Sequence, residues 1–477
     1  MMWCALVCIA LAMNGVGSMS RWTILVSTGA MATLWLAATL VDAQDRKRPL
    51  NVILVLADDL GWQELGCYGN QFNQTPHLDA LARRGVRFTD AYAAAPVCSP
   101  QRAALLTGLA PARLGITGVL GPESQKYLDP ARITLAEIFH SHDYVTGIIG
   151  KWHLSGYASH GAPEVGPQRQ GFVEVLLGAE SCIGGGDYFH PYSFAPSIEA
   201  RLPDEHLIDR CNLEAVDFVN RHAEKPFFLY LSHYAVHRAI RGRADWLAHF
   251  VEKPDAGKNS LTSHNNPHLA AQLTQIDEGI GQLTAALKAH DLLENTLFIF
   301  TSDNGGESTV TTNGPLRDGK STLYEGGLRV PLIMSGPGCM PRRTCAVPVA
   351  GEDLFPTILS LCDVPLPQGL KVDGKSFADL LAGAKSPHRD ALYWHYPLRE
   401  PHFLGGNSSG AIRQGNWKLI EFFSDGKMEL YNLADDLGET KDLRLSRPQI
   451  ASRLYDKLAT WRKQVGAEVV VQEEGVQ

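Results

Sequence analysis

The chain has 477 residues, of which 45% are hydrophobic and 20% are charged. A chain of this length and composition can bury one large core with a smaller domain attached, and it is not a disordered protein. Its formal net charge of −8 is spread without long runs of one sign, so no broad positive field gathers nucleic acid or another polyanion. An anionic substrate therefore has to be held by a few local cations.

The first 43 residues are almost uncharged and predict an export signal. With Met19 as the true start, Trp22–Val41 forms the apolar segment of a signal peptide, and Val41-Asp42-Ala43 is a small-residue cleavage site. We therefore expect a secreted or periplasmic protein that keeps no membrane span once residues 1–43 are removed. The alternative is an uncleaved membrane anchor, because about 20 apolar residues can cross a bilayer.

The mature chain keeps an odd number of cysteines, and none has the paired spacing of zinc ligands. In an exported protein six of the seven could form disulfides while one has a special role or stays free. Cys339 could bridge to Cys345 across a short turn, and Cys182 could bridge to Cys211. The full set is Cys67, Cys98, Cys182, Cys211, Cys339, Cys345 and Cys362.

Apolar strands alternate with helices between residues 44 and 365. Two apolar runs, Asn51–Ala57 and Thr296–Ser302, are typical of buried parallel strands. Further strands are predicted at 145–149 and 226–232, and helices at 75–84, 100–107, 133–140, 212–222 and 269–290. This alternation predicts an α/β domain over residues 44–365, built on a large, mostly parallel sheet flanked by helices.

The pattern changes after residue 365. Ala411–Ile420 and Met428–Tyr431 predict antiparallel strands, and residues 448–465 predict a helix. Residues 366–477 are therefore expected to form a smaller C-terminal α+β domain that contains an antiparallel sheet.

Acidic and amide side chains follow the two apolar strands at their carboxyl ends. Asp58 and Asp59 come directly after the first strand, and Asp303 and Asn304 after the second. Open α/β sheets bind ligands at this edge, so the four side chains are expected to converge. Oxygen ligands without His or Cys favour calcium or magnesium over zinc. Each pair taken alone would be an ordinary solvated turn or helix cap.

The most specific feature is Cys98-Ser-Pro-Gln-Arg102, which opens a predicted helix. It resembles the signature C-x-P-x-R of the type I sulfatases, in the alkaline phosphatase superfamily. The resemblance continues over nearly the whole mature chain, through Leu56–Asp59, Thr75–Asp79, Gly150–Leu154, Asp303–Gly305, Lys320 with Tyr324–Gly327, and Glu429–Leu433. It implies an arylsulfatase-like enzyme with one calcium ion, held by Asp58, Asp59, Asp303, Asn304 and the residue made from Cys98.

The resemblance also implies that a maturation enzyme oxidises Cys98 to formylglycine. The hydrated aldehyde offers two hydroxyls on one carbon, so one can attack sulfur and the other can later expel sulfate. A serine could not perform the second step. Pro100 suits the first helical turn, whose amide dipoles put partial positive charge beside the nucleophile. Arg102 is expected to stabilise the ionised hydroxyl.

Two histidines and two lysines complete the implied catalytic site. Lys151 is expected to bind the substrate sulfate and His153 to act as a base, and both face one side if the segment stays extended. His237, rather than His233, aligns with the family's second histidine and is expected to contact the sulfate beside Lys320. Either His237 or Lys320 could help to protonate the leaving oxygen. The implied substrate is a sulfate ester on a sulfated sugar.

The motif departs from the family at Gln101, where Ser or Ala is common. The core Cys, Pro and Arg are intact, so maturation is still expected. A phosphonate or phosphate ester hydrolase of the same superfamily and a non-catalytic binder of sulfated glycans are the alternatives. Residues 314–321 match a nucleotide P-loop letter for letter, but they follow a polar loop and not a strand.

Overall fold

The computed structural model describes residues 48–121, 124–155, 165–177, 188–194, 198–257, 264–385, 389–467 and 469. The predicted signal peptide, residues 1–43, and Cys182 lie outside these ranges. Within the described ranges, no helix is both long enough and apolar enough to cross a membrane.

The central sheet holds nine strands of the described chain, in the order β4-β3-β5-β1-β6-β7-β2-β8, with β9 beside β2. Strands β4, β3, β5, β1 and β6 are parallel, whereas β7 runs antiparallel to both β6 and β2. The predicted, mostly parallel sheet is therefore confirmed. Its strands are β1 (Asn51–Ala57), β2 (Val86–Tyr92), β3 (Val145–Gly150), β4 (Glu174–Leu176), β5 (Phe227–Ser232), β6 (Thr296–Ser302), β7 (Arg329–Ser335), β8 (Arg343–Cys345) and β9 (Val349–Ala350).

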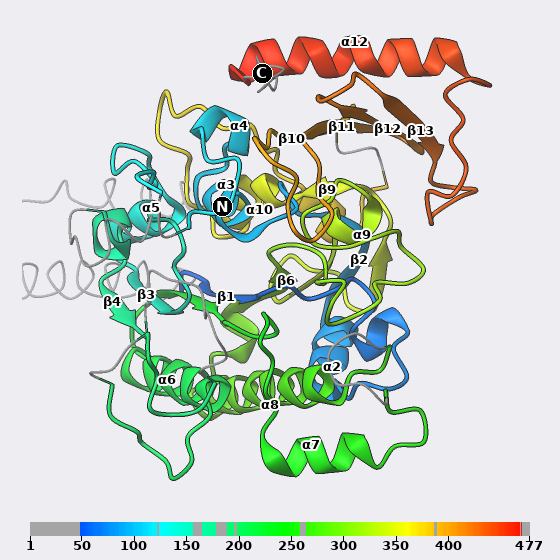
Figure 1. Ribbon diagram of the computed structural model, residues 1–477. Helices are drawn as coiled ribbons and strands as arrows, with labels where there is room; N and C mark the ends of the chain where they lie inside the picture. The colour runs from blue at the N-terminus through cyan, green and yellow to red at the C-terminus, as the bar shows by residue number, and fades with distance from the viewer. Residues whose placement is uncertain are drawn as a thin grey trace, which may run out of the picture. The chain divides into compact units, whose positions relative to one another are not determined.

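Helices cover both faces of this sheet (Figure 1). Along β1, Ile53 and Val55 pack with α2, α6 and α8, while Val52 and Leu54 pack with α3, α5 and α10. A strand buried on both faces alternates its side chains in this way. The described α-helices are α2 (Pro76–Arg84), α3 (Cys98–Thr107), α4 (Pro111–Leu114), α5 (Leu135–Ser141), α6 (Leu207–Arg221), α7 (Ala244–Val251), α8 (Pro267–Ala289), α9 (Glu325–Leu328), α10 (Leu354–Leu361), α11 (Ala378–Leu381) and α12 (Pro448–Val465).

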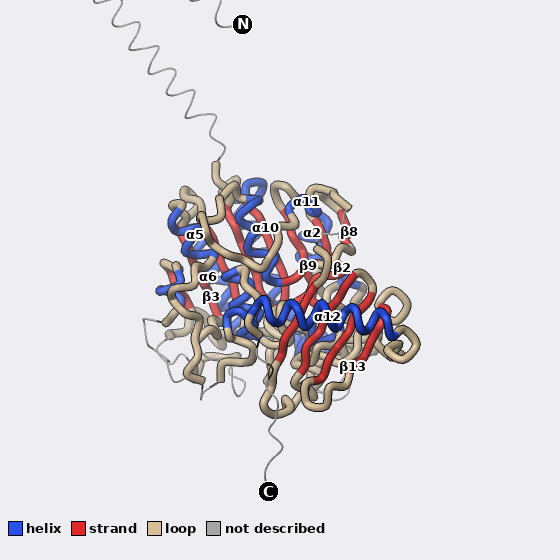
Figure 2. The backbone as a smooth tube through the Cα atoms, turned by 90° about the horizontal axis from the view of Figure 1, so that it is seen from above, coloured by secondary structure: helices blue, strands red, loops and turns tan. Residues whose placement is uncertain are grey.

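A separate antiparallel sheet follows in the C-terminal region, in the order β10-β11-β12-β13. Helix α12 lies across its strands (Figure 2), where Leu454 and Leu458 pack against Ile412 and Leu430. The predicted C-terminal antiparallel sheet is confirmed, and the domain boundary at residue 365 stays a prediction. The strands are β10 (Leu392–Tyr396), β11 (Ser409–Gln414), β12 (Trp417–Phe422) and β13 (Met428–Asn432).

A buried ionic cluster ties the second sheet to the chain that carries Lys320. Lys418 Nζ on β12 lies 2.9 Å from a carboxylate oxygen of Glu325 and 2.9 Å from one of Glu439. Arg329 Nε lies 2.9 Å from the other oxygen of Glu325. Glu325 begins α9, a few residues after Lys320. The cluster therefore holds the segment behind Lys320 against the C-terminal sheet.

A Lys418→Ala variant is expected to lose about 3–5 kcal/mol of unfolding free energy, because it leaves buried carboxylates without their cation. Urea unfolding followed by tryptophan fluorescence measures the change. Lys457→Ala is the matched control, since Lys457 on α12 makes a partly exposed pair with Asp390, and it should lose no more than about 1 kcal/mol. Equal losses in both variants would contradict a structural role for the buried cluster.

The six described cysteines are all free, so the suggested disulfides are wrong. Cys345 is held by the pairing of β8 with β2 and is buried with Cys339 in the core beneath α10. Cys211, on α6, is a free thiol, which excludes the bridge to Cys182. These thiols pack as small apolar side chains.

Candidate active site

The carboxyl ends of β1 and β6 bring four oxygen-bearing side chains together, because the two strands are parallel neighbours in register. Asp59 N donates to Asp303 Oδ1 at 3.1 Å, and Asn304 Nδ2 donates to Asp59 Oδ1 at 2.8 Å. Asp58 and the other three residues are buried. The structure therefore places the four predicted metal ligands at one point.

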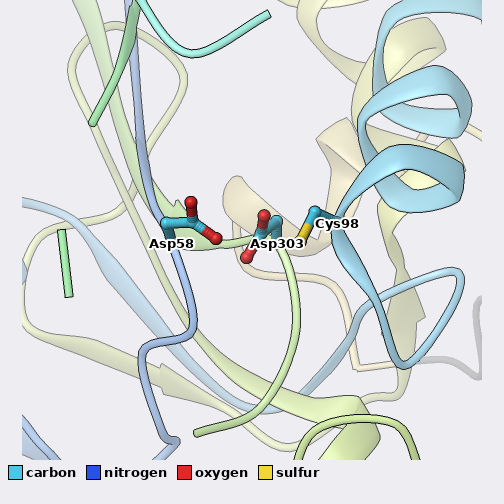
Figure 3. Close-up of side chains that lie close together, drawn as sticks. All are labelled: Asp58, Cys98 and Asp303. Atoms are coloured by element: carbon cyan, nitrogen blue, oxygen red, sulfur yellow. The ribbon is translucent and has the colours of Figure 1, made fainter. Parts of the chain in front are cut away.

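Cys98 is the first residue of α3 and lies at this edge of the sheet. Its sulfur, a carboxylate oxygen of Asp58 and one of Asp303 lie within 4.8 Å of one another (Figure 3). Cys98 is 1% exposed, and burial raises the pKa of its thiol to about 12. The unmodified thiol is therefore protonated at neutral pH and is a weak nucleophile.

The donor set fits a hard divalent cation. Asp58 Oδ1 and Asn304 Oδ1 are buried and have no hydrogen-bond partner among the described residues. An unpaired buried oxygen costs about 1–3 kcal/mol, and a cation that takes oxygen ligands removes that cost. Burial, together with repulsion from Asp58, raises the pKa of Asp303 to about 6. Added positive charge would keep Asp303 ionised.

Each carboxylate of this cluster has its own cationic partner. The nitrogen–oxygen distances are 2.5 Å for Lys151 and Asp58, 2.7 Å for Lys320 and Asp59, and 2.6 Å for Arg102 and Asp303. The formal charges of the buried group therefore cancel before a metal ion is counted. A divalent cation would make the group positive and so able to attract an anion.

Arg102 lies one helical turn after Cys98, so both side chains face the same sheet edge. Its Nη1 donates to Ser232 Oγ at 2.6 Å and to Lys151 O at 3.3 Å. Ser232 ends β5, the other neighbour of β1 in the sheet. The guanidinium is fully buried, and α3, β3 and β5 together fix its position beside Asp303.

Lys151 and His153 follow β3, but the segment does not stay extended. Gly150 has φ 95° and His153 has φ 56°. The chain bends because Gly150 passes close to β5, where a Cβ would lie 2.1 Å from Ser232 O. His153 is still buried, and burial, with the charge of Lys151, lowers its pKa well below the usual value. A neutral imidazole of this kind can accept a proton.

His237 and Lys320 lie beside Asp59. His237 Nε2 is 3.8 Å from Asp59 Oδ2, and Lys320 N donates to Gly306 O at 3.0 Å. Burial and the Lys320 charge lower the pKa of His237 to about 3. His233 is also buried, and burial alone lowers its pKa to about 3, without a charged neighbour. Of the two histidines, His237 is the one at the carboxylate cluster.

Gln101, the departure from the motif, supports the chain that leads into α3. Its Oε1 accepts a hydrogen bond from Ala94 N at 2.6 Å. It also packs on Gly351, where a Cβ would lie 2.2 Å from Oε1. The residue is buried, so it acts on the backbone before Cys98 and does not face solvent.

No sequence motif points to three further residues around the cluster. Ser232 accepts a hydrogen bond from Arg102, and its position at the end of a predicted core strand is the signal that could have identified it. Tyr396 ends β10, and burial and the proximity of Cys98 raise its pKa. His402 follows β10, and burial and the Lys320 charge lower its pKa. The latter two reach the site only because the C-terminal sheet folds beside it.

The comparisons with known proteins agree with this geometry. The sulfatase family model matches residues 50–364, and the model of the N-sulphoglucosamine sulphohydrolase C-terminal region matches residues 318–464. Arylsulfatase A of Homo sapiens is 35% identical over 81% of this chain and 78% of its own. N-acetylgalactosamine-6-O-sulfatase of Bacteroides thetaiotaomicron is 27% identical over 87% of this chain and 94% of its own.

Solved structures give the same result. The crystal structure of Ps i-CgsB in complex with k-i-k-neocarrahexaose is 29% identical and has a TM-score of 0.76, covering 87% of this chain and 93% of that one. Three observations point to the same family: the fold, the oxygen ligands at the strand ends, and the family model that matches most of the chain. The chain therefore belongs to the sulfatase family, as a type I sulfatase, and is a sulfuric ester hydrolase.

Proposed function

We propose that this sulfatase releases sulfate from sulfated carbohydrates, with formylglycine made from Cys98 as nucleophile and one bound calcium ion. The observation that carries the proposal is the convergence of the Cys98 sulfur with the carboxylates of Asp58 and Asp303, beside unpaired buried oxygens. The N-acetylgalactosamine-6-O-sulfatase and the neocarrahexaose complex among the relatives support a carbohydrate substrate.

The modification of Cys98 gives the site a nucleophile that the buried thiol cannot provide. The buried thiol, with its pKa raised to about 12, is a weak nucleophile. A maturation enzyme that oxidises Cys98 supplies an aldehyde, whose hydrate has one hydroxyl for attack on sulfur and another for the expulsion of sulfate. The start of α3 puts partial positive charge beside that position.

Calcium would be held by Asp58, Asp59, Asp303, Asn304 and the residue made from Cys98. When bound, it supplies positive charge that favours the ionised form of a hydroxyl and of the sulfate oxygens. Lys151 and Lys320 now pair with Asp58 and Asp59. Both lysines lie beside the proposed metal ligands, where they would bind the substrate sulfate once a cation shared the charge of these carboxylates.

The remaining polar side chains transfer protons, stabilise charge or bind the sulfate. His153 is neutral in its buried position and takes the proton from the attacking hydroxyl. Arg102 is fixed beside Asp303 and stabilises the negative charge that develops on that oxygen. His237 and Lys320, on the Asp59 side, bind the sulfate and assist protonation of the leaving oxygen.

Sulfate release by the matured, calcium-loaded protein tests the proposed function. The substrates are an aryl sulfate and sulfated oligosaccharides of galactose, galactosamine, glucosamine and fucose, with aryl phosphate and a phosphonate diester as rivals. We expect sulfate ester turnover to exceed turnover of the phosphorus esters. Faster hydrolysis of phosphate or phosphonate, or glycan binding without sulfate release, would overturn the proposal.

Calcium removal is expected to abolish turnover by more than about 100-fold, because the oxygen cluster loses the charge that activates the nucleophile. Chelation followed by dialysis, with calcium content and melting temperature measured alongside activity, checks this. Added calcium should restore activity and raise the melting temperature, since binding stabilises the folded state. Full activity in protein shown to hold no divalent metal would contradict a calcium site.

Export is part of the same proposal and rests on the sequence of residues 1–43. This segment would direct the enzyme to the periplasm or the medium and would be removed during export. N-terminal sequencing of the mature protein checks the predicted cleavage after Ala43.

A further inference from the structure

Three chain segments meet at the outer side of Lys320 and Asp59. They contribute Arg238, which follows His237 directly, Glu307 and the adjacent pair His402 and Phe403. Arg238 Nη1 lies 3.3 Å from Glu307 Oε1, and the Arg238 guanidinium carbon lies 6.0 Å from the centre of the Phe403 ring. We call Arg238, Glu307, His402 and Phe403 the rim.

The rim is fixed to the catalytic cluster through the loop after β10. His402 N donates to Gly406 O at 2.7 Å, which closes the loop on itself. Gly406 in turn packs on the backbone of Ser321, where a Cβ would lie only 1.9 Å from Ser321 O. Ser321 is the neighbour of Lys320, so the loop and the proposed sulfate-binding lysine are held together. The charges of Lys320 and Asp59 both act on His402.

Arg238 is half in solvent, with 50% of its side chain exposed, while its partner Glu307 is 2% exposed. The buried carboxylate also accepts a hydrogen bond from Thr309 Oγ1. Glu307 therefore anchors one nitrogen of the guanidinium, and the Arg238 side chain forms no other hydrogen bond with the described residues. The remaining donors are available for an anionic group that presents two oxygens, which arginine binds with two parallel hydrogen bonds.

Phe403 is 76% exposed and stacks on His402, with 4.5 Å between the ring centres and 29° between the planes. A single exposed aromatic side chain needs no explanation by itself. Here the ring stands next to an anchored arginine, at the edge of a site for anionic esters. A flat apolar face beside a cation matches a sugar ring that carries an acidic group.

We propose that Phe403 and Arg238 bind the sugar next to the one that carries the scissile sulfate, and that this second sugar is itself anionic. Its ring packs on Phe403, and its sulfate or carboxylate group pairs with Arg238. His402 joins the two positions, because it touches Phe403 and lies near Lys320. The inference rests on the proposed function, and it makes the substrate an acidic oligosaccharide rather than a lone sulfated sugar.

The test uses matured, calcium-loaded enzyme on an aryl sulfate and on disaccharides that share one sulfated sugar. The second sugar of each disaccharide is neutral, sulfated or carboxylated. We expect kcat/KM of the wild type to be about tenfold higher for the two acidic disaccharides than for the neutral one. A preference for only one of them identifies the anionic group that Arg238 binds.

Arg238→Gln should remove this preference, mainly through KM, whereas Arg238→Lys should retain part of it. Phe403→Ala should raise KM about tenfold for all the disaccharides, whereas Phe403→Trp, which keeps an aromatic ring, should have a KM close to that of the wild type. Both losses should be larger on disaccharides than on the aryl sulfate, which cannot reach the rim. Melting temperatures check that each variant is folded.

Two control variants remove an arginine charge and an exposed apolar side chain at positions away from the rim. Arg84→Gln breaks an exposed pair with Glu294 at the opposite end of β6, and Leu445→Ala removes an apolar side chain that is 82% exposed. Neither should alter the substrate preference.

The outcomes separate the inference from the proposed function. Wild-type enzyme that releases sulfate from the disaccharides but does not distinguish acidic from neutral ones overturns the inference alone. Hydrolysis of the aryl sulfate without any sulfate release from a disaccharide overturns both the inference and the carbohydrate substrate of the proposed function. Equal losses on every substrate in the Phe403 and Arg238 variants overturn it as well. No sulfate release from any substrate by matured enzyme overturns the function on which it rests.

Discussion

A Cys98→Ser variant is expected to react once with a sulfate ester and then stop. Serine has one hydroxyl, so it can attack sulfur but has no second hydroxyl on the same carbon to expel sulfate. We expect kcat to fall by about 10⁴-fold or more. Intact mass spectrometry after incubation with an aryl sulfate should show a stable sulfate adduct on residue 98.

Cys67→Ser is the matched control, because Cys67 is another free cysteine but is not part of the carboxylate cluster. It should keep wild-type turnover and carry no sulfate. Sustained turnover by Cys98→Ser within tenfold of the wild type would contradict the need for a hydrated aldehyde.

An Asp303→Ala variant is expected to lose both metal binding and stability. Asp303 is a proposed calcium ligand and also the partner of the fully buried Arg102, whose Nη2 lies 2.6 Å from Asp303 Oδ2. Removing one member of such a buried pair costs about 3–5 kcal/mol. Urea unfolding should show this loss, and calcium analysis should show an empty protein with turnover reduced at least about 10³-fold.

Asp245→Ala provides the comparison, since the side chain of Asp245 is 61% exposed in its pair with Arg243. Its loss should be about 1 kcal/mol or less, with calcium content unchanged. Wild-type calcium content and an unchanged urea midpoint in Asp303→Ala would show that the strand-end cluster is not the metal site.

The parallel part of the sheet could be predicted because its strands are buried on both faces. Strands β1, β3, β5 and β6 are short apolar runs, and helices α2 and α6 between them have clear apolar periodicity. Strand β2 was missed, since its burial alternates irregularly along Val86–Tyr92. Strand β7 contains Pro331, which argues against a central strand. The pairing of β2 and β7 shifts between Phe88 and Ala91, opposite Pro331, so a bulge accommodates the proline.

The parts of the candidate site that belong to short, continuous sequence motifs could be predicted. Cys98 and Arg102 lie in one helix turn, and the acidic pairs directly follow strands whose positions are visible in the sequence. Arg238 and Phe403 form no such pattern. They meet through the packing of Gly406 on the chain next to Lys320, which depends on how the C-terminal sheet folds. Local sequence patterns carry no information about such a contact.

The most direct test of the proposed chemistry measures residue 98 itself. The protein is co-expressed with a maturation enzyme, and mass spectrometry of the peptide that contains residue 98 gives the fraction converted to formylglycine. Across preparations with different conversion, sulfatase activity should rise in proportion to that fraction and vanish when it is zero. Full activity in protein that carries only unmodified Cys98 would contradict the account.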